Sequence, residues 1–189
     1  MVGNQWADSD RDPKPGSNVL VLTPSDELHP EACIDRLVHP LAGSETESVV
    51  IVSDDCSTTE IIETWHNYGF QLPKNSAIVS RGGTVQRPVT VDVDGVCRTT
   101  VTRADLSGLT RTVNTYLTRW RDDPLSTLWF DSITALLRTT DLETTYRLCH
   151  VLTTKVRHTD AIGYYRLDPS VHNARAVATL TPLFDLVLE

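Results

Sequence analysis

The chain has 189 residues and a formal net charge of -8, and its 40% hydrophobic content suits a single domain with one core. No run approaches the roughly eighteen consecutive apolar residues of a membrane-spanning helix. The polar, acidic N-terminus also lacks the basic start and apolar centre of a signal peptide. We therefore expect a cytoplasmic protein that has no membrane partner.

The basic residues are unevenly distributed, because three are lysine and the other fourteen are arginine. An acidic, lysine-poor and threonine-rich composition is typical of proteins adapted to molar salt, where screening shortens to about 3 Å and surface acids repel weakly. An ordinary acidic protein of low-salt cells is the alternative. Under the salt-adapted interpretation, negative charge says little about partners.

The four cysteines are scattered along the chain, and no pair has the C-x-x-C or zinc-site spacing. We expect reduced, mostly buried thiols, as is usual in an intracellular protein. They are Cys33, Cys56, Cys97 and Cys149.

Residues 1–17 are rich in Asp, Pro and Gly and predict a flexible acidic arm, which leaves residues 18–189 as the folded domain. Short apolar runs predict strands at about 18–23, 49–53, 76–83, 127–131 and 160–169. Apolar residues at helical spacing predict helices at about 27–41, 58–68, 105–122 and 141–158, with a short helix and a last strand within 172–189.

Apolar strands that alternate with helices predict an α/β fold, with a mainly parallel central sheet and helices on both faces. Residues 84–104 alternate with period two and predict a small β-hairpin excursion that turns at Asp94-Gly95. The pattern leaves open whether this hairpin belongs to the sheet or forms an inserted flap. Sites in parallel sheets form at the carboxyl ends of strands, so the strand-end acids are the first candidates.

Four segments, taken in order, are similar to a known family: "GSNVLVLTPSDE", "ESVVIVSDDCSTTEII", "TLWFDSITALL" and "LCHVLTTKVRHTDAIGYYRLDP". Together they resemble the KaiC/RecA group of P-loop ATPases over about residues 17–188, and most of all small KaiC-like domains of unknown function from halophilic archaea. The resemblance implies a RecA/KaiC-like sheet. It also implies that Asp131 is the Walker B acid, followed by Ser132, and that Asp54 and Asp55 form the acidic pair ahead of a helix.

The loop after the first strand departs from that family. A working P-loop reads G-x-x-x-x-G-K-[ST], because glycines let backbone N–H groups wrap the phosphates and the lysine supplies charge. Here the loop carries Thr23, Ser25, Asp26 and Glu27, with no glycine and no lysine. A like-charge contact at about 4 Å costs on the order of 1 kcal/mol in water. We therefore expect no cofactor, and binding of a magnesium–nucleotide is disfavoured.

The first hypothesis is a non-catalytic, KaiC-like pseudo-ATPase that serves as an interaction or signalling module. RecA-type domains assemble side by side, so its partner is expected to be another protein or a further copy at such an edge contact. The second is an atypical nucleotide- and magnesium-binding ATPase that uses Asp131 with Asp54 and Asp55. The third is a DNA-associated, RecA-paralogue-like regulator. The arginines form no basic stripe in the sequence, so nucleic-acid binding is disfavoured.

Each candidate residue also has a structural interpretation. Asp131 and Ser132, the candidate metal ligands, can instead cap the next turn. Asp54 and Asp55 can be solvated loop acids. Arg81 precedes Gly82-Gly83 and forms either an anion-binding turn or an ordinary one. Minor alternatives are a cation site of the strand-edge acids and a metal shared by His29 and Cys33. We expect Trp65, Trp120 and Trp129 to pack in the core, whereas Trp6, in the polar arm, is a candidate anchor for a partner.

Overall fold

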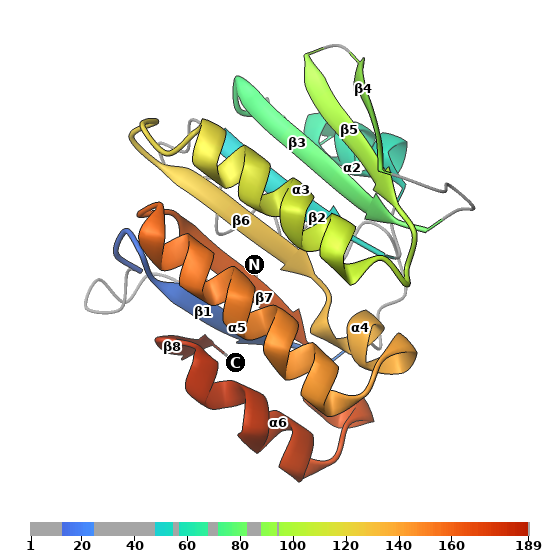
Figure 1. Ribbon diagram of the computed structural model, residues 1–189, viewed down its shortest axis with the longest axis vertical. Coiled ribbons are helices and arrows are strands. Elements are labelled where there is room, and N and C mark those ends of the chain that lie inside the picture. The colour runs from blue at the N-terminus through green and yellow to red at the C-terminus, as the bar shows by residue number, and fades with distance from the viewer. Residues whose placement is uncertain are drawn as a thin grey trace.

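The protein is described by a computed structural model that covers residues 13–24, 48–54, 57–67, 72–82, 88–93 and 95–188. Its centre is an eight-stranded sheet in the order β4-β5-β3-β2-β6-β7-β1-β8 (Figure 1). The strands are β1 (Asn18–Leu22), β2 (Ser48–Ser53), β3 (Asn75–Arg81), β4 (Val89–Val93), β5 (Val96–Val101), β6 (Ser126–Asp131), β7 (Ile162–Leu167) and β8 (Leu186–Leu188). Every neighbouring pair is parallel except β4 with β5, which confirms the mainly parallel sheet.

Helices cover both faces of this sheet, as the alternating pattern predicts. The helices are α2 (Thr58–Asn67), α3 (Leu106–Arg119), α4 (Ile133–Thr139), α5 (Leu142–His158) and α6 (Ala174–Leu180), with 3-10 turns η1 (Pro169–Val171) and η2 (Thr181–Leu183). The helices α3, α5 and α6 share one hydrophobic cluster with the sheet, whereas α2 packs in a second cluster on the opposite face (Figure 1).

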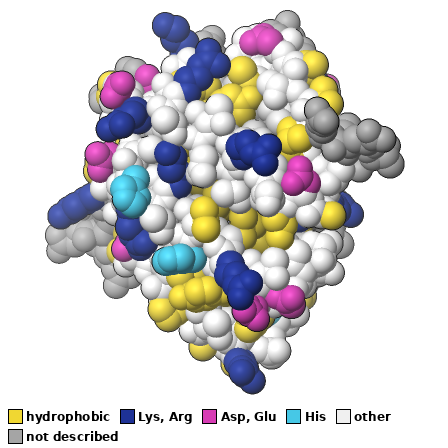
Figure 2. Space-filling view, viewed as in Figure 1, with side chains coloured by type: hydrophobic (Ala, Val, Ile, Leu, Met, Phe, Trp, Pro, Cys, Tyr) yellow, Lys and Arg dark blue, Asp and Glu magenta, His cyan; other side chains and the backbone are white. Residues whose placement is uncertain are grey.

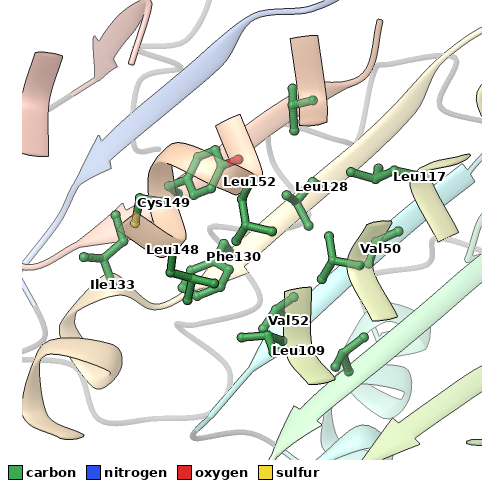
Figure 3. Close-up of a cluster of buried hydrophobic side chains, with 14 of the residues drawn as sticks. Val50, Val52, Leu109, Leu117, Leu128, Phe130, Ile133, Leu148, Cys149 and Leu152 are labelled. Atoms are coloured by element: carbon green, nitrogen blue, oxygen red, sulfur yellow. The ribbon is translucent and has the colours of Figure 1, made fainter. Parts of the chain in front are cut away.

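The central strands are mostly apolar because both of their faces are buried. In β2, Val50 and Val52 pack with α3 and α5, while Val49 and Ile51 pack with α2. Figure 3 shows the first of these clusters, where side chains of β2 and β6 meet those of α3 and α5. Each strand therefore reads as a continuous apolar run and not as an alternating one. The tryptophans Trp65, Trp120 and Trp129 are all buried, as expected.

Side-chain caps mark where the longer helices begin. Asp105 accepts a hydrogen bond from the Gly108 N–H at 2.7 Å and starts α3, and Asp141 accepts one from the Thr144 N–H at 2.7 Å and starts α5. The α3 helix ends at Arg119, three residues before the predicted end. The pattern did not predict α4, because seven residues are too few for helical periodicity to appear and most of its first residues are apolar like those of β6.

The two described strands within residues 84–104 belong to the sheet, because β5 pairs in parallel with β3 and β4 pairs antiparallel with β5 as the edge strand. Gly95 supplies the expected turn, with a φ of +81° that favours glycine. At the other end of the chain, the Gly16 N–H donates to the Ala161 carbonyl at 2.8 Å. The predicted boundary at residue 17 therefore falls within a stretch that is already bonded to the sheet.

Two predicted features lie outside the described residues: most of the acidic arm, residues 1–12, and the helix at 27–41. Among the residues that the structure describes, no helix is long and apolar enough to cross a membrane.

Candidate functional site

The carboxyl edge of the sheet brings two of the predicted acids together. Ser53, the last residue of β2, lies opposite Asp131, the last residue of β6, and the Asp54 N–H donates to the Asp131 carbonyl at 3.2 Å. Thr23 follows β1 at the same edge, where its N–H donates to the Leu167 carbonyl at 3.1 Å. The other predicted site residues, Ser25, Asp26, Glu27 and Asp55, lie outside the described part of the chain.

Asp131 is held in a buried ion pair. Arg166 lies on the neighbouring strand β7, and its Nε–H donates to Asp131 Oδ1. The two side chains are only 5% and 4% exposed. A charge that is buried this deeply is stable only with a partner, and here a guanidinium supplies it. The acid that the resemblance assigns to magnesium is thus neutralised by the protein itself.

Asp54 is held in the same manner by Arg81, the last residue of β3. The Arg81 Nη1–H donates to Asp54 Oδ2 at 2.6 Å, and both side chains are almost completely buried. A second Arg81 amino group donates to the Arg103 carbonyl at 2.9 Å. Burial lowers the pKa of Arg81, and the Asp54 charge opposes that shift. The interpretation of Asp54 as a solvated loop acid is therefore wrong, because its side chain is only 4% exposed.

Ser132 directs the chain from the sheet edge into α4. Its Oγ accepts a hydrogen bond from the Ala135 N–H at 3.1 Å, so Ser132 is the N-cap of this helix. The peptide bond between Asp131 and Ser132 is cis. The capping role that the sequence assigned to Asp131 and Ser132 together belongs to Ser132, while Asp131 serves the ion pair.

The cavity beside Asp54 is small. It has a volume of about 130 Å³ and is lined by Asp54, Arg103, Ala135, Arg138 and Thr139. Pockets for small organic ligands are typically about 300–1,000 Å³. Within the described ranges, no three or more His, Cys, Asp or Glu side chains are grouped so that they could hold a metal ion.

Sequence reasoning missed Arg166 and Asp168 at this edge. Arg166 stands inside the otherwise buried strand β7, and a buried arginine requires an anionic partner, so its position was a usable signal. Asp168 is 1% exposed and accepts hydrogen bonds from the Ser170 N–H and hydroxyl at 2.8 and 2.6 Å. Beside it, burial lowers the pKa of His172, an effect that Asp168 opposes and Arg138 reinforces.

Cys149 is expected to resist alkylation in the native protein. Its side chain is fully buried, and burial raises the pKa of the thiol to about 12, so on the order of one molecule in ten thousand carries the thiolate at pH 8. Mass spectrometry after iodoacetamide treatment should find Cys149 unmodified, whereas the partly exposed Cys97 reacts. Denaturation before labelling is the control. Equal native labelling at the two positions would contradict the packing of α5.

The fold and its edge define a mainly parallel α/β domain whose strand-end carboxylates are held in ion pairs. A family model described as "Family of unknown function (DUF7504)" matches residues 16–189, and the chain belongs to this family. No protein of curated function matches the sequence.

The fold itself is common among known structures. One similar structure is described as a structural study of a protein from Pyrococcus horikoshii OT3. It has 14% sequence identity and a TM-score of 0.59, and the match covers 92% of this chain and 81% of that one. In all, 163 chains of known structure match, so the fold alone does not select a function.

Proposed function

We propose that this chain is a non-catalytic, KaiC-like domain that acts as an interaction or regulatory module in a salt-adapted cytoplasm. One observation carries the proposal: both described acids of the supposed magnesium site, Asp131 and Asp54, are bound to buried arginines. A catalytic site for phosphoryl transfer needs carboxylates that face the metal and its waters.

The ion pairs also weigh against an atypical ATPase that uses Asp131 with Asp54 and Asp55. To bind Mg²⁺, either acid would have to leave a guanidinium that is itself buried, and the uncompensated arginine charge would then cost several kcal/mol, about 3–5 for a broken buried pair. Mg²⁺ also keeps several waters in an octahedral shell, which the small cavity beside Asp54 does not favour.

The partner under this proposal is a protein, or a further copy of the chain at a RecA-type edge contact. A non-catalytic KaiC-like domain would keep the sheet that forms such a contact. At its strand ends, ion pairs with arginine would stand where a catalytic domain has free metal ligands. The two buried arginines at this edge give no support to the DNA-associated alternative, because they are directed to aspartates.

Titration of magnesium and ATP by calorimetry in molar KCl tests the proposal. We expect no saturable heat up to millimolar nucleotide from the wild-type protein, because the strand-end acids are occupied by Arg166 and Arg81. Circular dichroism must show that the protein is folded under the same conditions. A saturable heat that Asp131→Ala abolishes would overturn the proposal and make the edge a nucleotide site.

A further inference from the structure

A long groove runs between α3 and α5 on the helical face of the sheet. Its main part has a volume of about 910 Å³ and runs along all of α3 and the first half of α5. A second hollow of about 480 Å³ continues it toward their C-terminal ends, and Asn114, Thr118 and Val151 line both parts. The groove lies apart from the Asp54 and Asp131 edge and plays no part in the ion pairs described above.

Every charged side chain that lines this groove is basic. They are Arg111, Arg119 and Arg147 in the main part, and Arg121 and Lys155 in its continuation. The whole chain, by contrast, has a net charge of -8. Figure 2 shows Lys and Arg side chains spaced around hydrophobic ones on this face. The sequence indicated no basic stripe, but the packing of α3 against α5 creates one.

The helices themselves carry little negative charge to offset these bases. The α3 sequence contains two arginines and no acid, and the α5 sequence contains three bases and one acid, Glu143. Glu143 is paired with Arg147 one turn later on the exposed surface of α5. Arg121, in the continuation of the groove, also lies 3.8 Å from an acid, Asp122, so the excess of positive charge comes mainly from Arg111, Arg119 and Lys155. This excess favours a negatively charged occupant.

Between the bases, the groove is lined by Ser, Thr and Asn together with a few aliphatic side chains. Leu106 and Val151 contribute aliphatic surface, and Val151 is 44% exposed although it is a large aliphatic residue, whereas Leu148 at the floor is only 5% exposed. The hydroxyls of Thr110 and Thr118, which also line the groove, donate to backbone carbonyls of their own helix at 2.8 and 2.6 Å. These hydroxyl donors are already used, so the groove offers aliphatic contact and cationic groups.

We propose that this groove binds an acidic, amphipathic helix of a partner protein. An apolar stripe of the partner would pack on Leu106 and Val151, and carboxylates on either side of that stripe would meet the arginines. The α3 helix has 14 residues, which corresponds to about 21 Å, so a partner helix of about four turns fills the groove. The inference rests on the proposed interaction role and specifies the chemistry of the partner.

A protein helix fits this surface better than a nucleic acid does. Single strands are bound by aromatic side chains on which bases stack, and among the described residues no Phe, Tyr or Trp lines the two parts of the groove. Duplexes are read by elements that project into their grooves, and the lining of this groove comes from the surfaces of two helices that are packed on the sheet. The exposed aliphatic residues are matched by the apolar face of a helix and not by a phosphate backbone.

The test uses a fluorescein-labelled, 16-residue designed peptide with Leu on one helical face and Glu on the other. Fluorescence anisotropy measures its binding to the full chain at the lowest KCl concentration at which circular dichroism shows a folded protein. We expect saturable binding by wild type and a loss of at least about tenfold in affinity for the variant Arg111→Glu/Arg119→Glu. Carbon-13 methyl spectra should shift at Leu106 and Val151 when the peptide binds.

A matched control carries the same change in net charge elsewhere. The variant Lys74→Glu/Arg175→Glu reverses two exposed bases outside the groove and should bind the peptide as wild type does. A peptide with Lys in place of Glu should bind wild type weakly and should recover affinity for Arg111→Glu/Arg119→Glu. These readouts do not depend on nucleotide, so this inference and the non-catalytic role fail in separate experiments.

Three results would overturn the inference. The first is a failure of charge recognition: either wild type shows no saturable binding of the acidic peptide, or Arg111→Glu/Arg119→Glu binds it as tightly as the control Lys74→Glu/Arg175→Glu does. The second is tighter binding of a labelled single-stranded or duplex oligonucleotide, which would assign the groove to nucleic acid. The third is a wild-type dimer in sedimentation velocity that Arg111→Glu/Arg119→Glu converts to a monomer, which would assign the groove to a second copy.

Discussion

Replacement of Arg166 by Ala is expected to lower the free energy of unfolding by about 3–5 kcal/mol, the usual cost of breaking a buried ion pair. The Asp131 side chain, which is 4% exposed in the native structure, would lose its guanidinium partner. Urea denaturation at constant KCl, followed by circular dichroism, measures the change. Urea is preferred to guanidinium because it is uncharged and does not screen the pair.

A double-mutant cycle separates the pair from the volume that each truncation removes. The double variant Asp131→Ala/Arg166→Ala should lose less free energy than the sum of the two single variants, because neither charge is then left buried alone. Whether Asp131→Ala raises or lowers the free energy of unfolding also bears on function. An acid held ready for a metal is often destabilising, so its removal would stabilise the fold, whereas an acid in an ion pair stabilises it. A stabilising Asp131→Ala would contradict the assignment.

The secondary structure was largely readable because it depends on local patterns. Residues 141–158 have apolar side chains at helical spacing after an Asp, and the structure has α5 at Leu142–His158 with Asp141 as its cap. The strands were equally clear, since β2 and β6 are continuous apolar runs. The helix α4 was missed because it is too short for a periodic pattern to appear.

The contacts of the site were harder to predict from the sequence, because they depend on which strands are neighbours in the sheet. Arg166 meets Asp131 across 35 positions of sequence, and only the adjacency of β6 and β7 brings them together. The groove has the same origin: Arg111 and Arg147 stand on helices that are separated in sequence and meet only because α3 packs beside α5. A local sequence pattern shows that these residues are charged, but it does not show which residues they contact in the fold.

The fold alone leaves the function of such a sheet open, since similar sheets support many activities. In this chain, two buried arginines neutralise two aspartates at the strand ends. Under the KaiC-like proposal these aspartates derive from a metal site, whereas in the structure they form ion pairs. The sites of contact with partners are then expected on other surfaces, of which the groove between α3 and α5 has the clearest charge.

Replacement of Arg81 by Met is expected to destabilise the protein by about 3–5 kcal/mol, although Met fills much of the same volume. The change leaves Asp54 buried without the guanidinium that bonds it at 2.6 Å. It also removes the donor to the Arg103 carbonyl, which joins the end of β3 to the turn before α3. The same urea titration measures the loss.

Arg103 is the matched control for this change, because it approaches the same carboxylate from solvent. Its Nε lies 4.0 Å from Asp54 Oδ1, but its side chain is 57% exposed, so the pair is screened and Arg103→Met should cost less than about 1 kcal/mol. Asp54→Asn in the Arg81→Met background should restore part of the loss, since it removes the uncompensated charge. If the Arg81 and Arg103 variants lose equal stability, burial does not set the strength of these ion pairs. Asp54 would then not be held away from a metal by its buried arginine, and the proposed non-catalytic role of this edge would lose its support.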